Sequence, residues 1–475
     1  MSIQEKVNLI HQQVTDITTI SDNEYARCLQ IFDKAEHNEE YKRLLFNGVI
    51  QHFSKIALIE IGNTYLSLMY ADKSSSDDYD GCWFSRHYFL RNAILQMASA
   101  WNKTATLIKY RFAVPDGRYG SEMDRVLRSL RKNTDFRSHR VKTLIDSFRS
   151  SHEYEAFIYM RDYLSHNIDP GYINYPKGNP TDIDWLKLTD IMWNIVNIIY
   201  NDHLTISIDI DDEIIDFYKV KVIIPPHLED VPVSEFNEGY FDLKYNCRAI
   251  INLTLNLFDY VKPWLVINIK NNDLICQCHL LIAMLNDISF RLHDAFRSFS
   301  ILLIKLSGDY SGIPEKVIEL IEKTPYYYLL NVAIVRLYSV FDKVGHLFTR
   351  VFSMPKDTTY FKTVSLWIID NADLSYNQLK YLLSSTIESN GYKALDLVRQ
   401  QYIHGQDLTF DQYEGTQLTL EYFLVMLFES FQVISRLVEF LHLDFFINEV
   451  NLLLPGSSDS LFEMLIIDNP YMPSN

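Results

Sequence analysis

Long stretches of uninterrupted helical periodicity limit the fold of this chain more than any other feature. Residues 88–112 place apolar side chains at steps of three and four positions without a single Gly or Pro, and residues 326–352 show the same spacing. Two further apolar stretches, 185–200 and 418–446, have the same character. Only 15 of the 475 residues are Gly, which leaves few positions for tight turns or glycine-rich loops. We therefore predict a mainly all-α protein.

The first two of these stretches match one another at an offset of 240 residues. A polar residue followed by a lysine stands at the same place in each, Asn102-Lys103 and Asp342-Lys343. The other matching pairs are Ala93 with Ala333, Ile94 with Ile334, Ser99 with Ser339, Trp101 with Phe341 and Leu107 with Leu347. An apolar face that recurs with the same polar insertion indicates a duplicated helical unit.

The segment between the two halves has a different composition. Residues 204–224 are rich in β-branched side chains and partly alternate apolar with polar residues before Pro225-Pro226, which predicts a short β-hairpin or two short strands. Its acidic residues lack the Gly and the final Glu of a calcium-binding loop, so we expect a solvated turn there. The expected domains are a first helical domain at 1–202, a β-containing connector at 203–245 and a second helical domain at 246–475.

Several classes of protein are disfavoured by what the sequence lacks. It carries no phosphate-binding P-loop, no dinucleotide-binding GxGxxG, no HExxH and no GxSxG, so we expect neither a metal ion nor a cofactor. No secretory signal and no apolar run of membrane-spanning length is found, and the five cysteines are scattered. We expect a cytoplasmic protein without a membrane partner.

Two short motifs, each an arginine followed five positions later by a histidine, recur at nearly the offset of the long helices. Arg161 and His166 form the first, and Arg399 and His404 form the second, 238 residues later. The residues after each histidine favour the end of a helix, whose partial negative charge stabilises an imidazolium. A guanidinium can bind phosphate oxygens and a histidine can exchange a proton near neutral pH, so the pattern suits phosphoryl chemistry.

Other interpretations of the motifs stay open at this stage. Both copies could consist of a surface arginine and a histidine that caps its helix. A third and looser match, Arg436 with His442, has no counterpart 238 residues earlier. We expect it to be an ordinary pair on a helix surface.

With its two R-x4-H motifs, the sequence resembles the HEPN superfamily of α-helical bundles, which is defined by this pattern. The resemblance implies two HEPN-like bundles in a pseudo-two-fold arrangement and one composite active site for metal-independent RNA cleavage. The RNA 2′-OH would attack the adjacent phosphate and leave a 2′,3′-cyclic phosphate and a 5′-OH. The histidines would act as general acid and base and the arginines would stabilise the phosphate, and the catalytic set would be Arg161, His166, Arg399 and His404.

The residue after the arginine is often polar in this family. Asp162 fits that habit as a supporting residue, whereas Gln400 is less usual, so the second motif could be weaker or mainly structural. The resemblance also suggests a toxin or phage-defence effector whose partners are RNA and a cognate antitoxin or regulatory protein. Either a monomer with its site inside one chain or a homodimer would satisfy the motifs.

A basic segment gives independent support for an RNA partner. The chain as a whole has a net charge of −17, yet residues 109–149 hold 11 Lys and Arg against 5 Asp and Glu. A local basic surface on an acidic protein is typical of a phosphate-binding footprint. The alternatives are a solvated helix face or a docking surface for an acidic protein. The candidate RNA-binding residues are Arg118, Arg125, Arg128, Arg131, Lys132, Arg137 and Arg140.

Three functional hypotheses follow from these features. The favoured one is a metal-independent RNA endonuclease. The second is a non-catalytic HEPN-type module that binds RNA or a nucleotide and regulates a partner. The third is an all-α interaction protein with no role in nucleic-acid binding.

Overall fold

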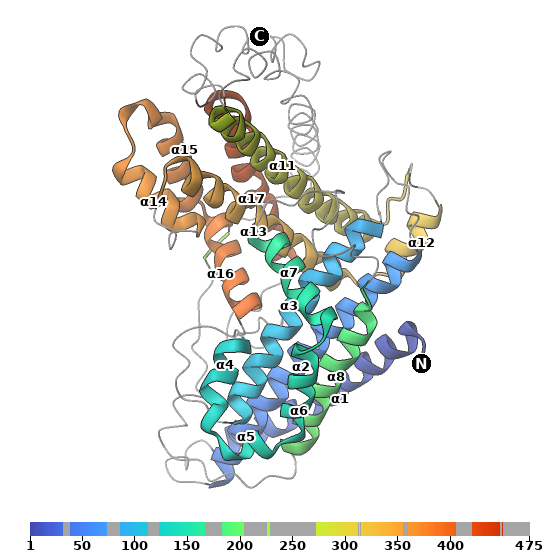
Figure 1. Cartoon of the computed structure of the whole chain (residues 1–475). Helices are drawn as coiled ribbons and strands as arrows, with labels where there is room; N and C mark the ends of the chain where they lie inside the picture. Colours follow the sequence, from blue (N-terminus) through green and yellow to red (C-terminus); the bar gives the residue numbers. More distant parts are fainter. Residues whose placement is uncertain are drawn as a thin grey trace. The chain divides into compact units, whose positions relative to one another are not determined.

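The structure, a computed structural model, is helical through most of its described part (Figure 1). The described residues are 1–31, 39–73, 86–112, 123–166, 183–203, 226–228, 272–311, 313, 315–354, 360–404, 420–446 and 449. No strand occurs among them, which confirms the all-α prediction for this part of the chain. The predicted hairpin at 204–224 lies outside the described residues, as does most of the predicted connector.

The chain divides into two compact units. The first is mainly Met1–Leu164 with Asn174–Ile223, and the second is mainly Ile224–Arg399 with Phe410–Asn475. In Figure 1 the helices of the first unit run from blue to green and those of the second from yellow to red.

The first unit is built around α2, which packs against α1, α3 and α8. By length and composition alone α2 could cross a membrane, and 71% of its most apolar window is buried inside the unit, as in a core helix. The helices are α1 (Ile3–Ile31), α2 (Glu39–Lys73), α3 (Arg86–Arg111), α4 (Met123–Ser129), η2 (Leu130–Lys132), α5 (Thr134–Ser138), α6 (Arg140–Arg149), α7 (His152–His166) and α8 (Trp185–His203).

The second unit is built around α13, which packs against α11, α14 and α17. The regular helices begin and end close to the predicted positions, since α13 and α17 fall within 326–352 and 418–446. The elements are α11 (Asn272–Ser307), α12 (Glu315–Lys323), α13 (Tyr326–Val351), α14 (Phe361–Asn371), η4 (Leu374–Tyr376), α15 (Asn377–Glu388), α16 (Asn390–His404), α17 (Leu420–Phe440) and the π-helical turn η5 (Leu441–Phe445).

The expectation of a surface pair at Arg436 and His442 is wrong for the histidine. His442 lies in η5 and is fully buried, because its turn packs into the apolar core of the second unit. Its Nδ1 donates to the Val438 carbonyl at 2.7 Å, and its Nε2 accepts from the Ser289 hydroxyl at 2.8 Å. Burial lowers the pKa of His442 to about 4, so this imidazole is a neutral structural group.

The duplicated lysine forms the same buried ion pair in both units. In the first unit, Lys103 Nζ of α3 lies 3.4 Å from Glu60 Oε1 of α2, and both side chains are almost fully buried. In the second unit, Lys343 Nζ of α13 lies 3.6 Å from Asp287 Oδ2 of α11, again with both side chains buried. A buried charge requires a partner, so each pair joins its two long helices at an equivalent position.

The two motif helices begin in the same way. Both α7 and α16 have 15 residues, and a serine precedes each of them. The Ser151 hydroxyl accepts a hydrogen bond from the backbone N–H of Tyr154 at 3.1 Å, and the Ser389 hydroxyl accepts one from that of Tyr392 at 3.2 Å. This is N-capping at the third helical residue, and it fixes where each motif helix starts.

The capped tyrosines attach the motif helices to the repeated long helices. Tyr154 packs against Trp101 with ring centroids 5.9 Å apart, and Tyr392 packs against Phe341 at 4.9 Å. Trp101 and Phe341 are one of the pairs that match between the long helices of the two halves. The repeat therefore extends from the long helices to the helices that carry the motifs.

The buried lysine leads to a test of this framework. Replacing Lys103 by Ala leaves the Glu60 carboxylate buried without its cation, and we expect unfolding of the first unit to become easier by about 3–5 kcal/mol. The double variant Lys103→Met, Glu60→Leu should recover most of this loss, because an apolar pair needs no desolvated charge. Urea denaturation monitored by circular dichroism measures both.

The control is Lys323→Ala in α12, which removes an exposed pair with Glu319 and should change stability little. Equal stability losses in the Lys103→Ala variant and this control would contradict the assignment of a framework role to the buried pair.

Candidate functional site

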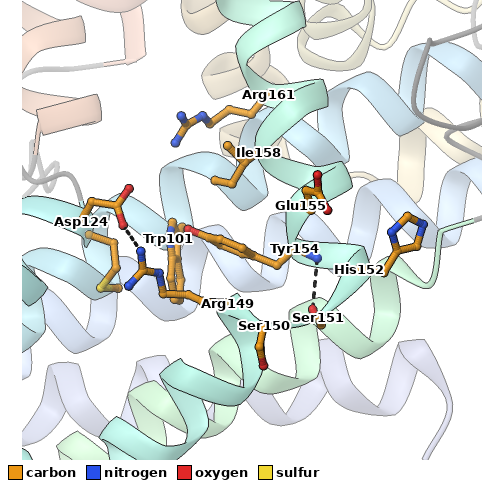
Figure 2. Close-up of a pocket in the computed structure, with 11 residues that line it drawn as sticks. Trp101, Asp124, Arg149, Ser150, Ser151, His152, Tyr154, Glu155, Ile158 and Arg161 are labelled. Carbon is orange, nitrogen blue, oxygen red and sulfur yellow. Dashed lines mark hydrogen bonds and ion pairs between the residues drawn. The ribbon is translucent and has the colours of Figure 1, made fainter.

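Arg161 lies at the edge of a cavity of about 620 Å³ in the first unit, which we call the α7 hollow. Figure 2 shows Arg161, Arg149 and Asp124 extending toward the same side of this hollow, whereas His152 points away from them. The part of the lining that matters here consists of the apolar Trp101, Tyr154 and Ile158 and the charged Asp124, Arg149, Glu155 and Arg161.

A second cavity of about 520 Å³, the basic hollow, adjoins the first. Its lining has five cationic side chains and two carboxylates: Arg128, Arg131, Arg137, Lys142 and Arg149 with Asp124 and Asp146. Asp124 and Arg149 line both hollows, so they mark the place where the two meet. The hollows together connect the basic segment to the arginine of the first motif.

Some of the predicted RNA-binding residues line the basic hollow and others do not. Arg128, Arg131 and Arg137 line the basic hollow. Arg125 and Lys132 are exposed on α4 and η2 but line neither hollow.

Of the two remaining candidates, Arg140 lines neither hollow. The Arg140 guanidinium pairs with the Asp202 carboxylate of α8 at 2.9 Å, which turns it toward another helix. Arg118 lies outside the described residues.

Arg149 was counted in the basic segment but was missed as a site residue. Its guanidinium forms an ion pair with the Asp124 carboxylate, and 38% and 60% of the two side chains are exposed (Figure 2). Tyr154 also lines the α7 hollow. Burial is the main cause of the raised pKa of its hydroxyl, and the nearby Asp124 carboxylate raises that pKa further. The pair joins positions 25 residues apart, so no local spacing in the sequence could have revealed it.

Arg399, the counterpart of Arg161, is held inside its own unit. Its guanidinium lies 3.6 Å from Asp342 Oδ2 and 4.3 Å from the centre of the Tyr338 ring, and only 12% of its side chain is exposed. The Tyr338 hydroxyl in turn donates to Asp396 Oδ1 at 2.9 Å. Arg399 Nε and Asp342 Oδ1 are buried and have no hydrogen-bond partner among the described residues. The two motif arginines therefore have different surroundings.

Burial dominates the electrostatics around Arg399. It raises the pKa of Asp342 to about 6, although the neighbouring Arg399 and Lys343 cations oppose that rise. Burial also raises the pKa values of the Tyr338 and Tyr392 hydroxyls, and both phenols stay neutral. Asp342 consequently gains or loses its proton close to neutral pH.

Both motif histidines lie in helical backbone, since α7 extends to His166 and α16 extends to His404. The residues that follow each histidine lie outside the described part of the structure, so the predicted helix ends stay predictions. The side chains of these histidines, of Asp162 and of Gln400 lie outside the described part of the structure. A composite site formed by the two motifs stays a prediction.

Comparison with known proteins adds no family to this geometry. No protein-family model, curated protein or solved structure matches the chain. Within the described residues, no group of three or more His, Cys, Asp or Glu side chains lies together as metal ligands would.

The raised pKa of Asp342 predicts how the stability of the second unit depends on pH. The folded pKa of about 6 exceeds the ordinary value of 3.8, so the folded state binds this proton more tightly than the unfolded state does. Stability from this group is present in full below pH 3.8 and is lost as pH rises through 6. We expect the free energy of unfolding to fall by about 1–3 kcal/mol as pH rises through this range because of Asp342. The Asp342→Asn variant should not show this fall.

The measurement is the free energy of unfolding in urea at several pH values between 4 and 7. The difference between the wild type and Asp342→Asn should change across this range, while Asp370→Asn, an exposed change on α14, should follow the wild type. Parallel curves for wild type and Asp342→Asn would rule out a raised pKa at Asp342.

Proposed function

We propose that the chain is a metal-independent RNA endonuclease of the HEPN type. The observation that supports this most strongly is that Arg161 lines a hollow which adjoins the basic hollow at Arg149. RNA bound by the cations of the basic hollow would need to continue only as far as the neighbouring hollow to reach Arg161. Clustered cations bind the phosphate backbone without regard to base sequence.

In this proposal the reaction is an internal transfer at phosphorus. One motif histidine takes the proton of the 2′-OH, whose oxygen attacks the adjacent phosphorus, and the P–O5′ bond breaks. The other histidine gives a proton to the leaving 5′ oxygen, and a 2′,3′-cyclic phosphate remains. Arg161 stabilises the negative charge that develops on the non-bridging oxygens. The groups are Arg161 and His166 of α7 with Arg399 and His404 of α16.

The two motifs have unequal roles in the proposal. Arg399 is engaged by Asp342 and stacks on Tyr338, whereas the positions equivalent to these two residues in the first half are Asn102 and Ala98. Arg161 lines the α7 hollow, whereas only 12% of the Arg399 side chain is exposed. We therefore propose that the first motif provides the main phosphate contact and the second mainly supports it.

The engagement of Arg399 also favours a second candidate, a non-catalytic module that binds RNA through the first unit. The biological setting follows from the resemblance alone: a cytoplasmic toxin or phage-defence effector restrained by an antitoxin or regulatory protein. RNA binding is common to both candidates, so cleavage is the property that separates them.

Incubation with single-stranded RNA in the presence of EDTA tests the proposal. We expect fragments that end in a 2′,3′-cyclic phosphate and begin with a 5′-OH. Arg161→Ala and His166→Ala should each slow cleavage by at least about 100-fold, because each removes a group that acts in the transition state. Arg399→Ala should slow it by less than about tenfold. Gel analysis of end-labelled RNA measures all four proteins.

Arg350→Ala, an exposed change on α13, is the matched control and should cleave at the wild-type rate. RNA binding without cleavage would replace the proposal by the non-catalytic module. A larger effect of Arg399→Ala than of Arg161→Ala would reverse the roles of the two motifs.

A further inference from the structure

We infer that in the free protein the Asp124 carboxylate is bound to the Arg149 guanidinium at the place where a phosphate would bind. An RNA strand binds by displacing this carboxylate. The inference rests on the proposed function for its ligand, single-stranded RNA, and assigns two residues that the motifs do not include. Arg149 becomes a phosphate-binding residue and Asp124 its internal competitor.

The position of the pair is the first argument. Among the described lining residues, only Asp124 and Arg149 border both the α7 hollow and the basic hollow. A strand that follows the cations from Arg137 toward Arg161 must therefore pass this pair. A carboxylate resembles one edge of a phosphate, since both offer two oxygens to the fork of a guanidinium.

The second argument is that the pair can open at small cost. Both side chains are more than one-third exposed, and ion pairs at this level of exposure contribute little to stability. Arg149 lies in the last turn of α6, where its own helix already favours a cation, so it needs no carboxylate to remain in place. An incoming phosphate can therefore replace Asp124 without disturbing the fold.

The third argument concerns selectivity. Asp124 is part of the same unit as Arg149 and competes with every incoming anion. The net binding free energy of a single phosphate that displaces it is therefore small. A strand held at the same time by the other cations of the basic hollow overcomes this competitor, because its additional contacts make the exchange intramolecular. The pair would thus favour polynucleotides over free phosphate or mononucleotides.

The test is a double-mutant cycle on RNA binding. A fluorescent single-stranded 20-nucleotide RNA is titrated with the full chain carrying His166→Ala, and binding is followed by anisotropy at several salt concentrations. Asp124→Asn should tighten binding by about three- to tenfold, because it releases Arg149 for phosphate. Arg149→Ala should weaken binding, and in the Arg149→Ala background Asp124→Asn should give almost no gain.

Asp135→Asn is the matched control, since it removes the same charge from an exposed position on α5 that lines neither hollow. Its gain should stay below twofold. An equal gain from Asp135→Asn, or an Asp124→Asn gain that persists without Arg149, would reduce the effect to overall charge and overturn the inference.

Two further outcomes would also overturn it. One is that the chain does not bind RNA. The other is that a polyglutamate peptide binds as tightly as RNA with the same response to Asp124→Asn, which would assign the surface to an acidic protein. Because binding is read without cleavage, the inference can stand if the nuclease proposal fails, and it can fail while cleavage stands.

Discussion

Each unit depends on a lysine buried between two long helices. Lys103 with Glu60, and Lys343 with Asp287, must stay paired, because a lone charge in these cores would be costly. Each pair joins its two long helices at an equivalent position. Two residues before each lysine stands the aromatic side chain, Trp101 or Phe341, on which the tyrosine of the motif helix packs. Each motif helix therefore packs on the same long helix that carries the buried lysine.

The duplicated framework carries two different electrostatic environments. In the second unit an aspartate and a tyrosine on α13 hold Arg399, and burial makes that aspartate titrate close to neutral pH. In the first unit Asn and Ala stand at these two positions, and Arg161 lines a hollow beside a cluster of cations. The same helical scaffold therefore places one arginine against a carboxylate and an aromatic ring and the other in the lining of a hollow.

The sequence predicted the features that depend on local pattern and on repetition. The extents of α3, α8 and α13 and the matching Lys103 and Lys343 follow from periodicity and offset. Contacts between distant residues could not be predicted. The ion pair of Arg149 with Asp124 joins the last turn of α6 to α4, and the burial of His442 depends on the π-helical turn in which it lies. Arg140 stays a predicted RNA contact, and its ion pair with Asp202 of α8 could not be predicted from local spacing.

The central claim is that the hollows of the first unit, rather than the equivalent region of the second, receive RNA. Photo-crosslinking of a 4-thiouridine-substituted RNA strand to the His166→Ala protein, followed by mass spectrometry of the peptides, tests it directly. The account predicts crosslinks concentrated on residues 123–161, which carry α4 to α7. Crosslinks concentrated on α13 and α16 instead, with none on 123–161, would contradict it.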